Sequence, residues 1–244
     1  ATYTAAAASS SRQPITTPPV VRPNREVGGL MVAFGTGRNI TEGDRTDATS
    51  QQSIYSILDN TRYEIETTGT GKGKVKIKAS NPTPSTVSDR TQLQAQSVDT
   101  GSKQAGTGVS AGRAFWKFNS TKVTYACNPT DTGCTVKKGW YMDFPEAGER
   151  LLAQMDFYAG SNLLEIISEV PASGSATSDS EEVCTPSPRA VKNFRTILNI
   201  STGSPSSAPL MNADGNTYTD AAGNTYGIYN SSDAGFARMD ASTK

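Results

Sequence analysis

The chain alternates short stretches of strand-like hydrophobic pattern with stretches rich in glycine, proline and polar residues. Apolar runs of strand length, many with period-two alternation and bounded by turn-forming residues, are typical of β-strands. We expect about ten short strands on this basis. The clearest lie at 28–38, 53–59, 61–67, 74–80, 90–100, 113–127, 135–142, 162–171 and 193–204, with a further extended segment near 15–21.

One segment leaves two interpretations open. Residues 146–158 can be drawn as an amphipathic helix, but Gly148 and the AGSN break at 159–162 weaken it. The following stretch, NLLEIISEVP, is typical of a buried strand ended by proline. No long helix is predicted elsewhere. The pattern therefore predicts an all-β protein.

Two stretches repeat the order apolar strand, glycine-containing turn, second strand: LMVAFGTGR…SIYSILDN and GWYMDFPEAGER…NLLEIISEV. Strand-and-turn units of about 40–50 residues suggest antiparallel strands arranged as partial or complete β-propeller blades with long polar loops. We expect a loop-rich segment at 1–27, a propeller-like β domain at 28–210 and an Asn/Asp/Gly-rich segment at 211–244.

Composition excludes several classes of function. Lys+Arg and Asp+Glu both number 23, so no global field attracts a polyanion and non-specific nucleic-acid binding is not expected. The chain has no histidine, which removes Ser-His-Asp and Cys-His catalysis and His-ligated zinc. No apolar run approaches the roughly 18 residues of a membrane span. Residues 1–19 lack the layout of a signal peptide, so an export signal would have been removed or would lie outside this chain.

The three cysteines indicate an oxidising compartment. Cys127 and Cys134 bracket NPTDTG, a run of turn formers between strand-like stretches, which suits a disulfide at the base of a hairpin loop. Two free thiols are the alternative. Cys184 is left over, either free or paired outside this chain. A disulfide would place the protein in the periplasm, at the cell surface or outside the cell.

The strongest candidate site is NADGNTYTD. It places oxygen-bearing side chains at positions 1, 3, 5 and 9 of an EF-hand-like pattern for calcium, although position 12 is Gly223. The candidate ligands are Asn212, Asp214, Asn216 and Asp220, with Asp233 as a substitute for the missing ligand. A turn-rich hairpin with Asx-turns explains the same residues without metal. An ordered loop would present three tyrosines as a contact surface: Tyr218, Tyr226 and Tyr229.

Other candidates have simpler structural explanations. The acidic loop with Glu42, Asp44 and Asp47 could hold a cation, but a solvated loop is the plainer interpretation. Glu146 and Glu149 could serve glycoside hydrolysis only at a suitable separation. GTGKG at 69–73 lacks the phosphate-loop spacing and predicts a hairpin turn. We also expect Trp116, Trp140 and Phe34 in the core, the lysines of 74–78 on a solvated strand face, and Gly35 and Gly37 in a structural turn.

An ordered set of motifs resembles a known family. VGGLMVAFGTGRNITEGDRTD followed by QSIYSILDN resembles the FGTG(R/K)…(S/T)xYxxxD signature of the type IV pilus tip adhesin and biogenesis factor family, the PilY/PilC type. In the same order, KGWYMDFPEAGERLLAQ, FRTILNISTG, DGNTYTDAAGN and NSSDAGFARM resemble later elements of that family. Together these matches run from about Arg12 to Met239.

The resemblance implies the C-terminal β-propeller region of a larger surface protein of the type IV pilus. On that basis we expect a non-enzymatic protein, exported through the periplasm, that acts in pilus assembly and tip adhesion. Its partners would be pilus subunits or minor pilins and a receptor that the sequence does not identify. Family members are several-fold longer, so we expect this chain to be the last few blades of such a propeller, a truncated relative or a fragment. A structural subunit of an extracellular filament and a quinoprotein-like propeller enzyme are the alternatives.

Overall fold

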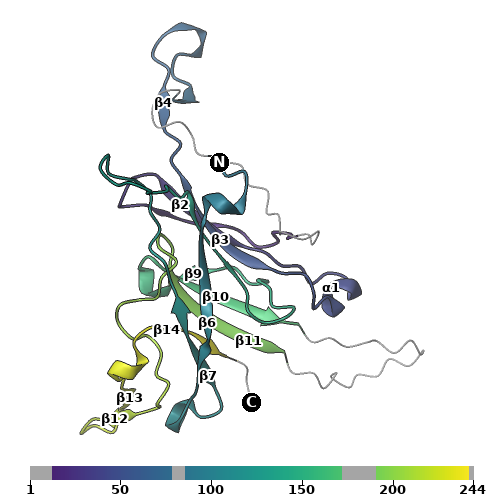
Figure 1. The fold of residues 1–244 in the computed structure, drawn as a ribbon, viewed down its shortest axis with the longest axis vertical. Helices are drawn as coiled ribbons and strands as arrows, with labels where there is room; N and C mark the ends of the chain where they lie inside the picture. The colour runs from purple at the N-terminus through teal and green to yellow at the C-terminus, as the bar shows by residue number, and fades with distance from the viewer. Residues whose placement is uncertain (1–12, 79–85, 172–190, 242–244) are drawn as a thin grey trace.

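A computed structural model describes residues 13–78, 86–171 and 191–241. Its strands form one ten-stranded sheet and two separate two-stranded hairpins (Figure 1). Among the described residues the single α-helix, α1, spans Glu42–Thr46, and five short 3-10 turns account for the rest of the helical structure. The predicted all-β class, with antiparallel strands and long polar loops, is confirmed.

The large sheet has two halves that share one long strand. Every neighbouring pair is antiparallel except β6 and β8, which are parallel. Strand β6 pairs with β8 through its first residues and with β7 through the remainder. In sheet order the strands are β1 (Val20–Pro23), β2 (Leu30–Gly35), β3 (Ser53–Asp59), β8 (Gly139–Asp143), β6 (Gln94–Ala105), β7 (Ala114–Asn119), β14 (Phe236–Asp240), β11 (Lys192–Asn199), β10 (Leu163–Val170) and β9 (Asp156–Phe157).

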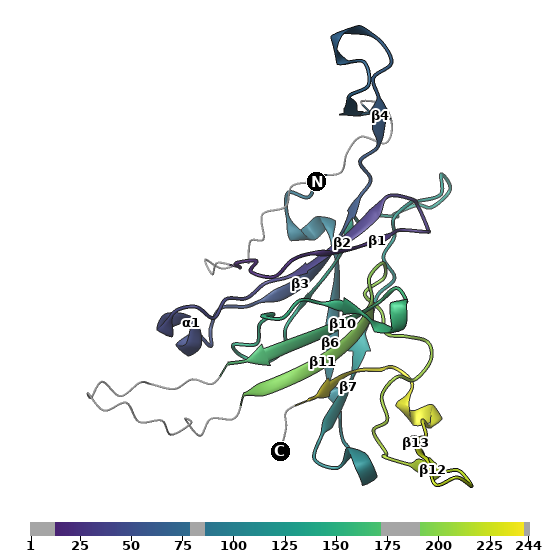
Figure 2. The same cartoon turned by 180° about the vertical axis from the view of Figure 1, so that it is seen from behind.

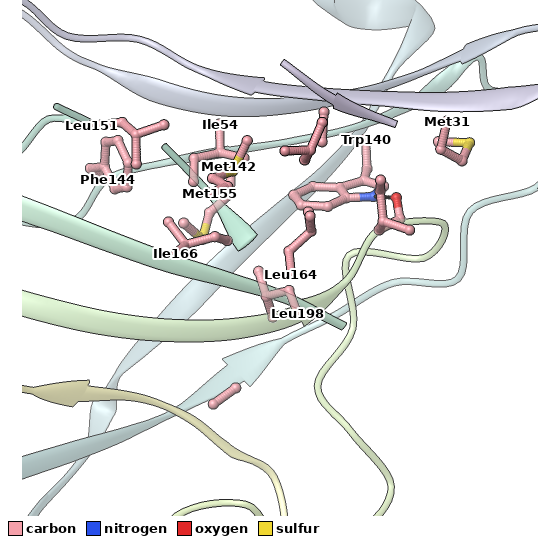
Figure 3. Close-up of a cluster of buried hydrophobic side chains, with 14 of the residues drawn as sticks. Met31, Ile54, Trp140, Met142, Phe144, Leu151, Met155, Leu164, Ile166 and Leu198 are labelled. Carbon is pink, nitrogen blue, oxygen red and sulfur yellow. Dashed lines mark hydrogen bonds between the residues drawn. The ribbon is translucent and has the colours of Figure 1, made fainter. Parts of the chain in front are cut away.

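The main core is built from both halves of the sheet. Figure 3 shows side chains from β3 and β8, including Ile54 and Trp140, pointing toward Leu164 and Leu198 of β10 and β11. All four of these side chains are fully buried. Trp116 belongs to the same cluster, so the prediction that both tryptophans are core residues is confirmed. Burial of this kind supplies most of the driving force for folding.

The segment after the FPEAG turn connects the two halves at one end. Leu151 N–H donates to the Thr36 carbonyl just beyond β2, at 3.0 Å. Arg150 exchanges two backbone hydrogen bonds with Glu169 of β10, at 2.9 and 3.0 Å. Neighbouring residues of this segment thus form backbone hydrogen bonds with opposite halves of the sheet, and the segment bridges the two halves at this end.

Two small hairpins stand apart from the large sheet. Strands β4 (Tyr63–Ile65) and β5 (Val75–Ile77) flank the turn that contains GTGKG, which confirms the predicted hairpin. Strands β12 (Thr217–Thr219) and β13 (Thr225–Gly227) form the second. Figures 1 and 2 show the two hairpins at opposite ends of the molecule.

The disulfide between Cys127 and Cys134 is present, with 5.9 Å between the two Cα atoms. The predicted strands beside it are shorter than expected, because residues 120–138 contain no assigned strand. One backbone hydrogen bond, from Lys137 N–H to the Thr124 carbonyl at 2.7 Å, replaces the ladder. The disulfide therefore closes an irregular loop. Cys184 lies outside the described residues.

The structure corrects several predicted boundaries. The acidic loop with Glu42, Asp44 and Asp47 contains the helix α1. A capping box between Thr41 and Asp44 begins this helix, although its sequence has no apolar periodicity. The strand predicted at 90–100 begins later and ends later than expected, because β6 spans Gln94–Ala105 and continues to its last residue by pairing with β7. The alternative helix at 146–158 does not form, and Gly148 has a positive φ of 77°.

The predicted segment boundaries do not separate structural units. Strand β14 follows residue 211, yet it lies between β7 and β11 inside the large sheet. Strand β1 precedes residue 28 and pairs with β2 along its full length. The prediction missed β14 because FARMD is short and is buried with little alternation, so its apolar pattern is weak.

Candidate contact site in the C-terminal segment

The FGTG and GER motifs pack directly against each other. A Cβ atom added to Gly35 would lie 2.3 Å from Leu151 Cδ2. A Cβ atom on Gly37 would lie 2.7 Å from both Arg150 Cβ and the Leu151 carbonyl oxygen. Glycine is required here for close approach rather than for the predicted turn, since residues 36–39 form none.

The Thr-Gly turn after β11 packs on Trp140. The Trp140 indole N–H donates to the Ile200 carbonyl at 2.8 Å, and the Ser56 hydroxyl donates to the same oxygen at 2.7 Å. A Cβ atom on Gly203 would lie 2.6 Å from the indole ring. Phe34 is buried, as predicted, and stacks on Tyr55. These motifs therefore pack against one another within the fold.

The two glutamates of the PEAGER segment do not form a catalytic pair. Glu149 is fully buried and makes two hydrogen bonds with the Arg238 guanidinium, at 2.7 and 2.8 Å. It also accepts a hydrogen bond from the Ser168 hydroxyl. Glu146 is partly exposed, and its carboxylate lies 3.6 Å from Lys192 Nζ. Glycoside hydrolysis needs two carboxyl groups facing one substrate, and Glu149 is committed to the core.

The acidic loop is organised by arginines. Arg38 binds the Asp44 carboxylate through two contacts of 2.9 and 3.0 Å from its Nε. This hydrogen bond holds the pKa of Asp44 well below its usual range. The buried Arg150 guanidinium donates to the carbonyl oxygens of Gly148, Arg38, Asp44 and Asp47. The Asp44 carboxylate and the carbonyl oxygens of Asp44 and Asp47 therefore already have partners within the chain. The interpretation of this segment as a solvated loop accounts for both residues without a cation.

The C-terminal segment forms a lobe beside the sheet. It comprises the loop before β12, the β12–β13 hairpin and a 3-10 turn at Ser231–Asp233 that leads into β14 (Figure 2). The turn at Gly108–Ser110 and Thr107, which directly precedes it, hold this lobe in place. Thr107 N–H donates to the Ala213 carbonyl at 2.9 Å, and its hydroxyl donates to the Asp214 carbonyl at 2.6 Å.

Asp233 is the buried anchor of the lobe. One carboxylate oxygen accepts the Ala213 N–H at 3.3 Å, and the other accepts the Asn230 N–H at 3.0 Å. The residue is completely shielded from solvent. A buried carboxylate that accepts backbone N–H groups satisfies donors that would otherwise be orphaned. Asp233 thus joins the two ends of the segment that carries the hairpin.

Asn212 and Asp214 form successive Asx-type turns, and Asn216 takes part through its backbone N–H and carbonyl groups. The Asn212 side-chain oxygen accepts the Gly215 N–H at 2.8 Å, and its amide donates to the Asn216 carbonyl at 3.0 Å. One Asp214 carboxylate oxygen lies 3.5 Å from the Asn216 N–H, and the other contacts the Asn230 amide. This hydrogen bonding matches the turn interpretation considered from the sequence.

Asp220 lies at the opposite end of the hairpin. Its carboxylate accepts the N–H groups of Ala222 and Asn224 and the Asn224 side-chain amide, at 2.9 to 3.1 Å. The Asn224 side chain contributes most to lowering the Asp220 pKa. Strand β12 separates Asp220 from Asn216. At the rise per residue of a β-strand, the Cα atoms of these two residues are roughly 13 Å apart.

Calcium ligands lie roughly 2.3–2.6 Å from the ion, so Asp220 and the residues near Asn212 cannot share one ion in this arrangement. Within residues 13–78, 86–171 and 191–241, no group of three acidic, histidine or cysteine side chains is placed to hold a metal. Calcium in this segment stays a prediction.

The three predicted contact tyrosines are all exposed. Tyr218 and Tyr226 are directly opposite each other in the β12–β13 register, so their side chains lie on the same face of the hairpin. Each is more than half exposed. The Tyr226 hydroxyl lies 3.2 Å from the Asp220 carboxylate. Tyr229 follows β13, and its hydroxyl lies 3.5 Å from the Leu210 carbonyl.

A cavity of about 200 Å³ lies beside Tyr229. One wall is a row of cross-strand neighbours on the sheet: Arg195, Met239 and Phe115 come from β11, β14 and β7. Leu210 and Met211 of the C-terminal segment form part of the opposite wall. An exposed tyrosine beside a hollow lined by both apolar and polar side chains is a typical composition for a contact surface, because tyrosine offers both apolar area and a polar tip.

Comparison with known proteins agrees with the motif order. Residues 1–102 match a family model described as the PilY1 beta-propeller domain. The crystal structure of the Pseudomonas aeruginosa PilY1 C-terminal domain superimposes with a TM-score of 0.63 and 21% sequence identity. The alignment covers 99% of this chain. The chain is similar to the C-terminal region of PilY1. This confirms the resemblance found in the sequence.

The chain spans 42% of the length of the PilY1 structure that it matches. At this identity the structural likeness establishes the fold alone, which is similar to that of part of the PilY1 C-terminal domain. No curated protein matches the chain closely enough to add a second relative. The described part of the chain contains no helix of the length and apolarity needed to cross a bilayer.

The PilY1 family match ends before the tyrosine site begins. The matched range holds β1, β2 and β3 and the β4–β5 hairpin, whereas Tyr218, Tyr226 and Tyr229 lie in the part covered by the structural comparison alone. Sequence reasoning found the tyrosines but missed the role of Asp233. The spacing of Asn230 and Asp233, which is that of a capping box, was the available signal.

Proposed function

We propose that this chain is part of a non-enzymatic, exported surface protein of the type IV pilus that acts in pilus assembly and tip adhesion. The observation that carries the proposal is the match of residues 1–102 to the PilY1 family model, continued by the PilY1 C-terminal fold over almost the whole chain. The motifs behind that match build the fold. The proposal of a pilus function therefore rests on the similarity to PilY1, and we assign the contacts with partners to the exposed segments of the chain.

The disulfide supports an exported protein. Cys127 and Cys134 lie in an exposed, irregular loop rather than in the core. Disulfides of this kind persist in oxidising compartments and are rare in the cytosol. The proposed location is the cell surface, reached through the periplasm.

The contacts proposed for adhesion are those of the β12–β13 lobe. Tyr218 and Tyr226 form a paired aromatic face, which is anchored to the sheet through Asp233 and Thr107. Rigid aromatic side chains bind with little loss of side-chain entropy, and they are enriched among the residues that dominate interface energies. Pilus subunits, minor pilins or a surface receptor are the proposed partners.

A deletion and complementation experiment tests the proposal. In cells that naturally produce the protein, deletion of its gene should reduce the number of surface pili and the adhesion of the cells. Complementation with the wild-type gene should restore both. Complementation with Tyr218→Ser/Tyr226→Ser should restore pili but not adhesion, because the substitutions remove the aromatic face and leave the Asp233 anchor.

The matched control is Thr219→Ser/Thr225→Ser on the other face of the same hairpin, where the two hydroxyls are 3.1 Å apart. It should restore pili and adhesion fully. Normal piliation and adhesion in the deletion strain would refute the pilus function. A tightly bound quinone absorbance in the purified protein would favour the alternative of a quinoprotein-like enzyme.

A further inference from the structure

The β4–β5 hairpin projects from the body of the molecule as an arm, defined here as residues 62–78 (Figures 1 and 2). Among the described residues, its backbone hydrogen bonds join the two strands of the arm to each other. Glu66 exchanges backbone bonds with Gly73 and Lys74, and Lys78 N–H donates to the Arg62 carbonyl at 2.8 Å. An isolated two-stranded hairpin is at best marginally stable in water. Packing against a partner would therefore stabilise the arm.

One face of the arm is entirely apolar. Tyr63 is opposite Ile77 and Ile65 is opposite Val75 in the strand register, so all four side chains lie on the same face. Each of the four is more than half exposed. In the large sheet, residues of this type fill the core. Here they cover no part of the described protein, although an apolar face gains free energy only when it is buried.

The other face of the arm is charged. Glu64 is opposite Lys76, and their side chains form an exposed ion pair of 3.5 Å. Across residues 62–78 five basic side chains accompany two acidic ones, which gives the arm a net charge of +3 in a chain whose net charge is zero. A surface that complements the arm therefore combines an apolar strip with an excess of carboxylates.

The distribution of side chains favours a protein over a membrane as the partner. The tip of the arm, GTGKG, has no large apolar residue that could enter the acyl region of a bilayer. The apolar residues lie along the flank, where they can be laid into a groove.

We propose that the arm is a docking element whose apolar face occupies an apolar groove, bordered by acidic residues, on a partner protein. The inference is independent of the tyrosine site, because the two hairpins lie at opposite ends of the molecule. It goes beyond the proposed pilus function by assigning a second contact surface with a defined chemistry.

Site-specific photocrosslinking in the cells that naturally produce the protein tests the proposal. The photoreactive amino acid p-benzoylphenylalanine is placed at Tyr63 or Ile77 on the apolar face, and at Glu64 on the charged face as the matched control. We expect a protein adduct from the first two positions at least ten times stronger than from the third. Charge reversal by Arg62→Glu/Lys78→Glu should remove that adduct, because it inverts the charge at the base of the arm.

Each other outcome overturns the proposal. Adducts of equal strength from both faces, or adducts insensitive to charge reversal, would show that the apolar face has no specific partner. The absence of adducts from every position would show that it is free in the cell. A lipid adduct would assign the arm to a membrane. Formation of the Cys127–Cys134 disulfide in every variant serves as the check that the rest of the chain has folded.

Discussion

Glu149 and Arg238 form a fully buried ion pair with two parallel hydrogen bonds, although 89 residues separate them in the sequence. Glu149 lies in the GER motif, and Arg238 lies in β14. The Arg238 guanidinium also lies 3.9 Å from the centre of the Phe194 ring. The pair therefore ties the segment that connects the two halves of the sheet to a strand at the middle of one half.

We expect Glu149→Gln to destabilise the protein by about 3–5 kcal/mol, because it leaves the Arg238 charge buried without a counter-ion. The matched control is Glu165→Gln, whose partner is Arg195 of β11 and whose ion pair is partly exposed to solvent. That change should cost less than about 1 kcal/mol. Urea unfolding of both variants measures the difference. Equal losses would show that Glu149 and Arg238 are not coupled in a dry core.

Gly35→Val should destabilise the protein by about 1–3 kcal/mol or more, because the new side chain overlaps Leu151. Leu151→Ala should recover part of that loss in the double variant, since it removes the overlapping atoms. Gly43→Ala is the control, because the nearest atom to its added Cβ is 3.8 Å away. Thermal unfolding measures all four proteins. A Gly35→Val variant that melts like wild type and binds its partner less well would instead place a ligand at this glycine.

The stability contributed by Asp47 should depend on pH. Partial burial raises its pKa, but hydrogen bonds from Ser50 and Thr49 outweigh burial and lower the pKa to about 2. The folded pKa is thus below the value of about 3.9 for an unfolded chain. The contribution is present above that value and is lost as the pH falls toward 2. Asp47→Asn should be less stable than wild type at pH 7, and the difference should close between about pH 5 and pH 2. A difference that stays constant over this range in urea unfolding would contradict the assignment.

Calcium titration tests the predicted ligand set directly. Because Asp220 lies at the far end of β12, we expect any calcium affinity of this segment to be no tighter than about 10⁻⁴–10⁻³ M, the range of weak extracellular sites. Asp214→Ala should remove the calorimetric response, and Asp220→Asn should leave it unchanged. Affinity tighter than this, or a response that needs Asp220, would show that the segment rearranges into the predicted EF-hand-like loop.

The elements predicted well are those whose pattern is local. Strand β3 was predicted with its observed bounds, 53–59, because its apolar run is bounded by polar residues. The β4–β5 hairpin was predicted from alternation on both sides of a glycine-rich turn. Strand β14 was missed because its place is set by β7 and β11, which are distant in sequence. Local pattern carries no information about such pairing.

Part of the candidate site could likewise be predicted from the sequence, and part could not. The exposed tyrosines followed from the composition of a turn-rich segment, and their cross-strand pairing follows once the hairpin forms. The buried role of Asp233 could not be predicted from the sequence. Its partner Ala213 contributes only a backbone N–H, a group that every residue except proline has. The Glu149–Arg238 pair was equally hidden, because the sequence shows both residues as ordinary charges.

Immunogold electron microscopy of native pili tests the central claim most directly. Antibody against this chain should label the ends of pili and the cell surface at the base of pili, and the label should be absent from the deletion strain. Label spread evenly along the fibres would identify a structural filament subunit instead. Label confined to the cytoplasm would contradict the account of an exported, pilus-associated protein.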